Sequence, residues 1–283
     1  MTYGTLIGVE ALKSLLDAGA PVLLLDCAFE LGNPEVGPAT YRAGHLPGAR
    51  YAHLDHDLAG PSDGSNGRHP LPARVAFAAW LRAQGLRQGQ QVVAYDASGG
   101  VWAARAWWLL RWMGHGAVAV LDGGKPAWEA AGLPIETGEA LPVPEGDFTP
   151  GDPLVAGTVS ADEVLANIEH GAAQVLDARD PSRFRGDPNP IDPVAGHIPG
   201  AKNRCFKDNL GADGRFRPAE ELAADFTALL ADKPAILQCG SGVTACHNAL
   251  AMEVAGLAGA KVYVGSWSEW ICDPARPVAT GEA

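Results

Sequence analysis

The amino-acid sequence repeats itself. Residues 43–49 read AGHLPGA and residues 195–201 read AGHIPGA, so six of seven positions are identical at an offset of 152 residues. Further matches keep the same order along the chain, namely 22–27 with 174–179 and 92–105 with 235–248. A chain with this internal symmetry is expected to fold as two copies of one domain.

The two copies are predicted to have an α/β fold. The segments VVAYD at 92–96 and AILQC at 235–239 are almost wholly apolar, which is typical of strands buried on both faces of a sheet. Helical stretches, 101–113 and 244–255, follow them. Alternating strands and helices predict a mostly parallel sheet flanked by helices in each copy. In such sheets, the loops at the carboxyl ends of the strands hold the functional site.

A linker separates the copies. Residues 130–153 are rich in proline, glycine and acidic residues, and they lack a periodic apolar pattern. The sequence therefore predicts an N-terminal domain over 1–135, a linker over 136–153 and a C-terminal domain over 154–283.

Composition excludes several classes of partner. The chain has 21 Lys and Arg residues against 33 Asp and Glu, a net charge of −12, and no basic run, so we expect it to bind neither nucleic acid nor a membrane. No apolar stretch approaches the roughly 20 residues that span a bilayer, and the first residues do not resemble a signal peptide. Five cysteines without regular spacing predict neither a disulfide framework nor a zinc site. We expect a cytoplasmic setting in which an important cysteine acts as a thiol.

The loop after the second apolar run carries the candidate chemistry. Cys239 directly follows that run, and the small residues GSGVT at 240–244 lead into a helix. Gly240 and Gly242 permit backbone conformations that turn successive N–H groups toward the sulfur. The start of the next helix adds the positive end of a dipole. Both effects favour the thiolate, which is the nucleophilic form.

The repeat provides an internal comparison for this loop. Aligning YDASGGVWAAR with QCGSGVTACHN places Asp96 opposite Cys239, so the first copy lacks the thiol. We expect an inactive N-terminal domain in which Asp96 caps its own loop. His45 and His197 occupy the same position in the two heptapeptides. A residue present in both an active and an inactive copy is expected to fix a turn by hydrogen bonding.

These motifs resemble the two-domain rhodanese family of sulfurtransferases. The resemblance covers almost the whole chain and rests on the two AGH[LI]PGA elements, DAR at 177–179, SRFRG at 182–186, CGSGVT at 239–244 and GSWSEW at 265–270. It implies two tandem rhodanese-like domains, of which only the second is catalytic through a cysteine persulfide. It implies no metal and no organic cofactor.

The resemblance also implies a set of site residues. Cys239 is the nucleophile, and Ser241 with His69 and Asp57 is similar to a Ser–His–Asp relay, in which Asp55 is an alternative to Asp57. The expected substrate contacts are Arg183, which would hold a carboxylate, and the loop residues Gly240, Gly242, Val243 and Thr244.

The CGSGVT loop is similar to the 3-mercaptopyruvate sulfurtransferase type, because thiosulfate enzymes of the family carry basic residues directly after the cysteine. Ile191 stands where the mercaptopyruvate type often has a second arginine, a departure that leaves thiosulfate as the alternative donor. Arg179, Arg185 or Arg204 would then complete a basic pocket. The expected acceptor is cyanide or a thiol, such as thioredoxin or a low-molecular-weight thiol.

Two other classes are weighed against this interpretation. A cysteine phosphatase uses a similar cradle but needs an arginine six residues after the nucleophile, where this chain has Ala245. A non-catalytic rhodanese-like binding module would fit a loop without the thiol, whereas Cys239 is present.

Overall fold

The structure is a computed structural model that describes residues 2–282. Its contacts group the chain into two units. The first consists of the chain up to Gly60, Pro72–Leu154 and Ala212–Phe216. The second consists of Pro61–Leu71, Val155–Gly211 and the chain from Arg217 onward. The short segment 61–71 therefore belongs by its contacts to the second unit, although it precedes most of the first in sequence.

Within residues 2–282, the first unit contains one five-stranded parallel sheet with the strand order β1-β5-β4-β2-β3. Its elements are β1 (Leu6–Ile7), α1 (Val9–Asp17), β2 (Val22–Asp26), α2 (Val36–Ala43), β3 (Arg50–Tyr51), α3 (Arg74–Ala83), β4 (Gln91–Tyr95), α4 (Ala103–Trp112), β5 (Val118–Leu121) and α5 (Gly124–Ala130).

The second unit repeats this topology over the described residues, with the strand order β6-β10-β9-β7-β8 and all pairs parallel. Its elements are β6 (Thr158–Val159), α6 (Ala161–His170), β7 (Gln174–Asp177), α7 (Pro181–Arg185), β8 (Lys202–Asn203), the 3-10 helix η1 (Phe206–Asn209), α8 (Ala219–Leu230), β9 (Ala235–Gln238), α9 (Thr244–Val254), β10 (Lys261–Tyr263) and α10 (Ser266–Trp270). The predicted fold, two α/β domains with parallel sheets flanked by helices, is confirmed.

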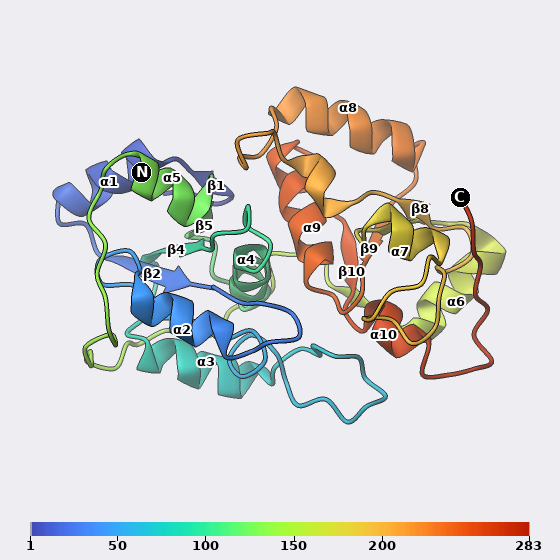
Figure 1. Cartoon of the computed structure of the whole chain (residues 1–283), viewed down its shortest axis with the longest axis horizontal. Helices are drawn as coiled ribbons and strands as arrows, with labels where there is room; N and C mark the ends of the chain where they lie inside the picture. Colours follow the sequence, from blue (N-terminus) through green and yellow to red (C-terminus); the bar gives the residue numbers. More distant parts are fainter. Residues whose placement is uncertain (1, 283) are drawn as a thin grey trace. The chain divides into compact units, whose positions relative to one another are not determined.

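Helices cover both faces of the second sheet (Figure 1). On one face, α6 and α10 contribute Val164, Trp267 and Trp270 to an apolar cluster with strand residues such as Val175. On the other face, α9 packs against β9 and β10, and α8 packs against α9. The central strand β9 is buried along its whole length, which explains its continuous apolar sequence.

Local sequence signals set the ends of α6. Ser160 Oγ accepts a hydrogen bond from the Glu163 N–H, and the Glu163 carboxylate accepts one from the Ser160 N–H, so the two residues form a capping box. Gly171 ends the helix with φ +60°, in the left-handed region that favours glycine. No helix within residues 2–282 has both the length and the apolar character needed to cross a lipid bilayer.

The predicted linker makes hydrogen bonds with the first unit. The Gly146 N–H donates to the Arg82 carbonyl, and the Phe148 N–H donates to the Leu86 carbonyl. Phe148 itself is buried. The exact boundaries at 135/136 and 153/154 stay a prediction.

The histidines of the two heptapeptides make equivalent contacts. Nδ1 of His45 donates to the Tyr41 carbonyl over 2.9 Å, and Nδ1 of His197 donates to the Phe184 carbonyl over 2.8 Å. Each imidazole also stacks on the ring of the same partner residue. The prediction that these histidines fix turns by hydrogen bonding is confirmed.

The loop after β4 is closed by its own carboxylate. Asp96 Oδ1 accepts the N–H groups of Ser98 and Gly100, and Oδ2 accepts those of Trp102 and Ala103, over 2.7–3.0 Å. Asp96 is almost fully buried. Its predicted role as a loop cap is confirmed by these four hydrogen bonds.

We predict that Asp96→Ala destabilises the first unit, because four N–H groups, two of them buried and two partly buried, lose their acceptor. The expected loss in the free energy of unfolding is about 3 kcal/mol, the upper range for hydrogen bonds to a charged group. Urea unfolding monitored by tryptophan fluorescence measures it. Asp17→Ala, at an exposed carboxylate on α1, is the control and should change the midpoint little. An unchanged midpoint for Asp96→Ala would contradict the capping role.

Candidate active site

Cys239 lies at the carboxyl end of the central strand β9, and the start of α10 holds its backbone. The Cys239 N–H donates to Ser266 Oγ over 3.1 Å, and its carbonyl accepts the Trp267 N–H over 3.0 Å. The Gly240 carbonyl accepts the Ser268 N–H over 2.9 Å. These bonds hold the backbone of the loop against the start of α10.

The loop forms the predicted cradle around the sulfur. Sγ of Cys239 accepts the N–H groups of Ser241 at 3.5 Å and Gly242 at 3.2 Å. Gly242 has φ +77°, and a Cβ there would lie 2.2 Å from the Val264 carbonyl oxygen, so only glycine fits. Val243 and Thr244 follow at the start of α9. The N–H groups and the helix dipole stabilise negative charge on the sulfur.

Other cysteines have different surroundings. Burial raises the pKa of Cys27 well above its usual value and the pKa of Cys205 to about 11, so both stay protonated at neutral pH. Cys246 is buried within α9, and its thiol donates to the Gly242 carbonyl. Cys272 is exposed. Cys239 differs from these four cysteines in that its sulfur accepts two backbone N–H groups of its own loop.

Ser241 and His69 are brought together as the sequence predicts. Nδ1 of His69 lies 2.7 Å from Ser241 Oγ, although 172 residues separate them. Both side chains are buried. His69 comes from the segment 61–71, which is fixed against the loop between β10 and α10. There, a Cβ on Gly67, whose φ is +87°, would lie 2.8 Å from the Gly265 carbonyl oxygen.

Asp57 belongs to the first unit. Its Oδ2 accepts the His53 N–H over 2.8 Å. Burial raises the pKa of the Asp57 carboxyl, and the hydrogen bond from His53 offsets part of this rise. Its role in orienting His69, and the alternative that Asp55 does so, stay predictions.

Arg183 is held by Asp192. Nε and Nη2 of Arg183 donate to the two carboxylate oxygens of Asp192 over 2.8 and 2.7 Å, a bidentate pair. Burial lowers the pKa of Arg183, but Asp192 and the nearby Cys239 outweigh it, so the guanidinium pKa is raised. A Cβ on Gly240 would lie 2.9 Å from Arg183 Nη2, which places this side chain directly over the loop.

Two further arginines, Arg179 and Arg68, lie near Asp192. Its carboxylate lies 3.4 Å from Arg179 Nη1 and 3.9 Å from Arg68 Nη1. Burial would raise the pKa of Asp192, but Arg183, Arg179 and Arg68 hold it below the usual range. Arg179 also pairs with Asp177 at 2.7 Å, so the cluster contains three arginines and two carboxylates.

The basic pocket that the sequence suggests has a different composition. Arg185 pairs with Asp187, and Arg204 pairs with Asp225. Arg179 is buried, and its guanidinium group donates through Nε and Nη2 to the carboxylate of Asp177. Arg68, which the sequence reasoning did not identify, lies over the loop instead: its Nη2 is 2.8 Å from the position of a Cβ on Gly240. The available signal was its place directly before His69.

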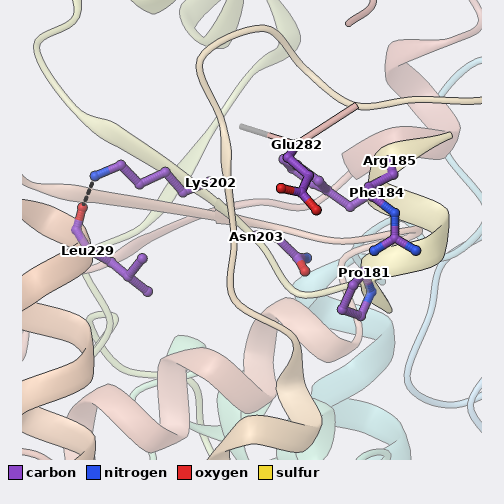
Figure 2. A pocket seen from close by; sticks show the side chains of 7 residues that line it. All are labelled: Pro181, Phe184, Arg185, Lys202, Asn203, Leu229 and Glu282. Carbon is purple, nitrogen blue, oxygen red and sulfur yellow. Dashed lines mark hydrogen bonds between the residues drawn. The ribbon is translucent and has the colours of Figure 1, made fainter. Parts of the chain in front are cut away.

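A separate hollow of about 370 Å³ lies beside α7 (Figure 2). It is lined by Pro181, Phe184, Arg185, Lys202, Asn203, Leu229 and Glu282. Nζ of Lys202 donates to the Leu229 carbonyl at its rim. Its lining residues differ from those around Cys239. Among residues 2–282, no three His, Cys, Asp or Glu side chains gather as a metal site would require.

Comparisons with known proteins agree with this geometry. The Rhodanese-like domain family matches residues 8–131 and 160–272, one match in each half. A protein of Pseudomonas aeruginosa described as a probable 3-mercaptopyruvate sulfurtransferase is 51% identical over 266 residues, covering 92% of this chain and 93% of its own. The human 3-mercaptopyruvate sulfurtransferase is 38% identical, covering 89% of this chain and 86% of its own.

Other relatives carry a different donor in their names. A putative thiosulfate sulfurtransferase of Mycobacterium tuberculosis is 42% identical, and the match covers 98% of both chains. Among solved structures, SseA of Escherichia coli, described among 3-mercaptopyruvate sulfotransferases, superposes with a TM-score of 0.82. It is 31% identical, and the match covers 94% of this chain and 99% of that protein. With a family match in each half, this chain belongs to the rhodanese-like family and carries two copies of its domain.

Proposed function

We propose that this protein is a 3-mercaptopyruvate sulfurtransferase that works through a persulfide on Cys239. The observation that carries the proposal is the sulfur of Cys239 in a cradle of N–H groups, beside the Ser241–His69 pair. An anion-binding cradle stabilises both the attacking thiolate and the persulfide that forms. The hydrogen-bonded hydroxyl and imidazole supply a route for a proton.

The first half-reaction transfers sulfur to the enzyme. The Cys239 thiolate attacks the sulfur of mercaptopyruvate, an S–S bond forms, and the C–S bond breaks. The electron pair of that bond goes to the carbon, which leaves as the enolate of pyruvate. Protonation of the enolate carbon gives pyruvate. The cysteine sulfur is oxidised to the persulfide level, and the substrate carbon is reduced.

The second half-reaction restores the cysteine. A thiol acceptor attacks the outer sulfur of the persulfide and becomes a persulfide itself, while Cys239 leaves as the thiolate. With cyanide as acceptor, the product is thiocyanate. The acceptor that we propose is a dithiol of the thioredoxin type or a low-molecular-weight thiol. We also propose a cytoplasmic location, because that reducing setting keeps the Cys239 thiol from forming a disulfide.

Each predicted site residue has a role in this scheme. Ser241 and His69 move the proton, and Asp57 orients the imidazole. The loop residues Gly240, Gly242, Val243 and Thr244 provide backbone N–H groups. Arg183 binds the carboxylate of the donor. The first domain is inactive because the carboxylate of Asp96 fills the corresponding loop.

Thiosulfate is the second candidate donor, with the same persulfide chemistry. Two guanidinium groups, those of Arg68 and Arg183, lie over Gly240 and would attract an anionic donor. A relative that is 42% identical is also described as a putative thiosulfate sulfurtransferase.

We predict that Cys239→Ser abolishes turnover while the fold persists, because an oxygen at this position cannot form a persulfide. After exposure to mercaptopyruvate, the wild-type protein should gain about 32 Da on Cys239, the mass of one sulfur. Peptide mass spectrometry under non-reducing conditions measures the gain. Cys272→Ser, at the exposed cysteine, is the matched control and should retain the modification. Sulfur found on another cysteine would refute the assignment.

We predict that Ser241→Ala and His69→Ala slow turnover of mercaptopyruvate by roughly 100-fold, the scale of general acid–base assistance. Thiosulfate turnover should fall much less, because sulfite leaves without a proton. Steady-state kcat with each donor decides the point. An equal loss of kcat with mercaptopyruvate and with thiosulfate would show that Ser241 and His69 do not transfer the proton.

We predict that Arg183→Ala weakens binding of mercaptopyruvate by about 1.5–3 kcal/mol, the value of a lost charge-assisted hydrogen bond. The measurement is kcat/KM for mercaptopyruvate and for thiosulfate, in the wild type and the variant. A higher wild-type kcat/KM for thiosulfate would make thiosulfate the preferred donor and leave the persulfide mechanism in place. Thermal melting of the variant is measured alongside, because Asp192 loses its bidentate partner.

A further inference from the structure

Ser268, a buried residue of α10, makes hydrogen bonds in three directions. Its N–H donates to the Gly240 carbonyl over 2.9 Å, in the loop after β9. Its Oγ accepts the Arg68 N–H over 3.0 Å and donates to the Gly265 carbonyl over 3.0 Å. A hydroxyl that accepts one hydrogen bond and donates another has a fixed orientation. Ser268 therefore joins the loop after β9 to the segment 61–71.

These bonds stand one residue before each member of the Ser241–His69 pair. Gly240, which is held by the Ser268 N–H, directly precedes Ser241. Arg68, which is held by the Ser268 hydroxyl, directly precedes His69. Both backbones are thus fixed against one residue. The distance of 2.7 Å between Nδ1 of His69 and Ser241 Oγ depends on where these two backbones lie.

The segment 61–71 approaches the backbone at the start of α10 closely. Gly67 has φ +87°, and a Cβ there would lie 2.8 Å from the Gly265 carbonyl oxygen, so the approach requires glycine. The next N–H along the segment, that of Arg68, is partly buried and needs an acceptor. Ser268 Oγ is that acceptor, and its own proton goes to the same Gly265 carbonyl.

The first unit supplies an internal comparison for Ser268. Aligning GGKPAW in the first copy with GSWSEW in the second places Pro126 opposite Ser268. In each unit the residue just before this position donates its N–H to the carbonyl of Asp96 or Cys239, over 2.9 and 3.0 Å, which supports the alignment. Proline has neither an N–H nor a hydroxyl. The copy without the thiol therefore lacks both groups with which Ser268 joins the loop to the segment.

We propose that Ser268 is a positioning residue for proton transfer, which holds His69 at hydrogen-bonding distance from Ser241. The proposal rests on the proposed function, in which this pair moves the proton. Ser268 acts through the two backbones that carry the pair and takes no part in the bonds that form and break. Without its hydroxyl, the Arg68 N–H loses its acceptor and the imidazole shifts relative to the loop. A misplacement of about 1 Å in a catalytic group lowers a rate by up to about 100-fold.

The test is Ser268→Ala, which removes the hydroxyl and keeps the N–H that is donated to Gly240. We expect kcat for mercaptopyruvate to fall about tenfold, because the imidazole is displaced rather than removed. The kcat for thiosulfate should stay close to wild type, because sulfite leaves without a proton. Ser268→Thr keeps the hydroxyl and should recover most of the loss. The matched control is Ser65→Ala, which removes an exposed hydroxyl of the same segment that donates to Asp63, and it should change neither kcat.

A double-mutant cycle with His69 separates this role from a general structural one. If Ser268 acts through the imidazole, Ser268→Ala should lower kcat for mercaptopyruvate no further once His69 is replaced by alanine. Losses that multiply in the double variant would contradict the proposal, because Ser268 would then act independently of His69.

Two results with the single variant would also overturn the proposal. One is an unchanged kcat for mercaptopyruvate, and the other is an equal fall with both donors, which indicates a structural role. If Ser268→Ala does not fold, Ser268→Cys keeps the volume with only a weak acceptor and should show the same difference between donors. Peptide mass spectrometry separates these failures from that of the proposed function. Without a persulfide on wild-type Cys239 after exposure to mercaptopyruvate the function fails, whereas a persulfide with an unaffected kcat rejects the role of Ser268 alone.

Discussion

Both units are organised to hold negative charge at the carboxyl end of a central strand. In the first unit the group in this place is the carboxylate of Asp96, which accepts four N–H groups of the loop after β4. In the second unit the corresponding acceptor is the sulfur of Cys239, with two N–H groups directed at it. The same strand-to-helix loop is therefore a structural cap in one unit and the proposed reactive loop in the other.

Positive charge around Cys239 depends on a buried carboxylate. Asp192 is bonded to Arg183, lies near Arg179 and Arg68, and has a lowered pKa. Without this carboxylate, three guanidinium groups could not stay so close in a partly buried site. Asp192 thus determines how close the arginines come to the loop. It also determines which of their N–H groups are free to bind another anion.

Much of this arrangement could be predicted from the sequence. The repeat and the apolar runs predicted the two parallel sheets, because the strand period and the order of elements are local properties. Cys239, its cradle and the contact of Ser241 with His69 followed from motifs. The contribution of Arg68 could not be predicted, because it depends on how the segment 61–71 folds against α10, 200 residues later. The partners of Arg183 and Arg179 were likewise set by tertiary packing around Asp192.

The charge balance of the cluster bears on the choice of donor. Arg68, Arg179 and Arg183 together exceed Asp177 and Asp192 by one positive charge, and a thiolate at Cys239 brings the sum to zero. A donor with one carboxylate would then leave one negative charge, whereas the thiosulfate dianion would leave two. Excess charge of one sign is costly where solvent is partly excluded. The cluster therefore favours a monoanion over a dianion, although its two converging guanidinium groups attract both.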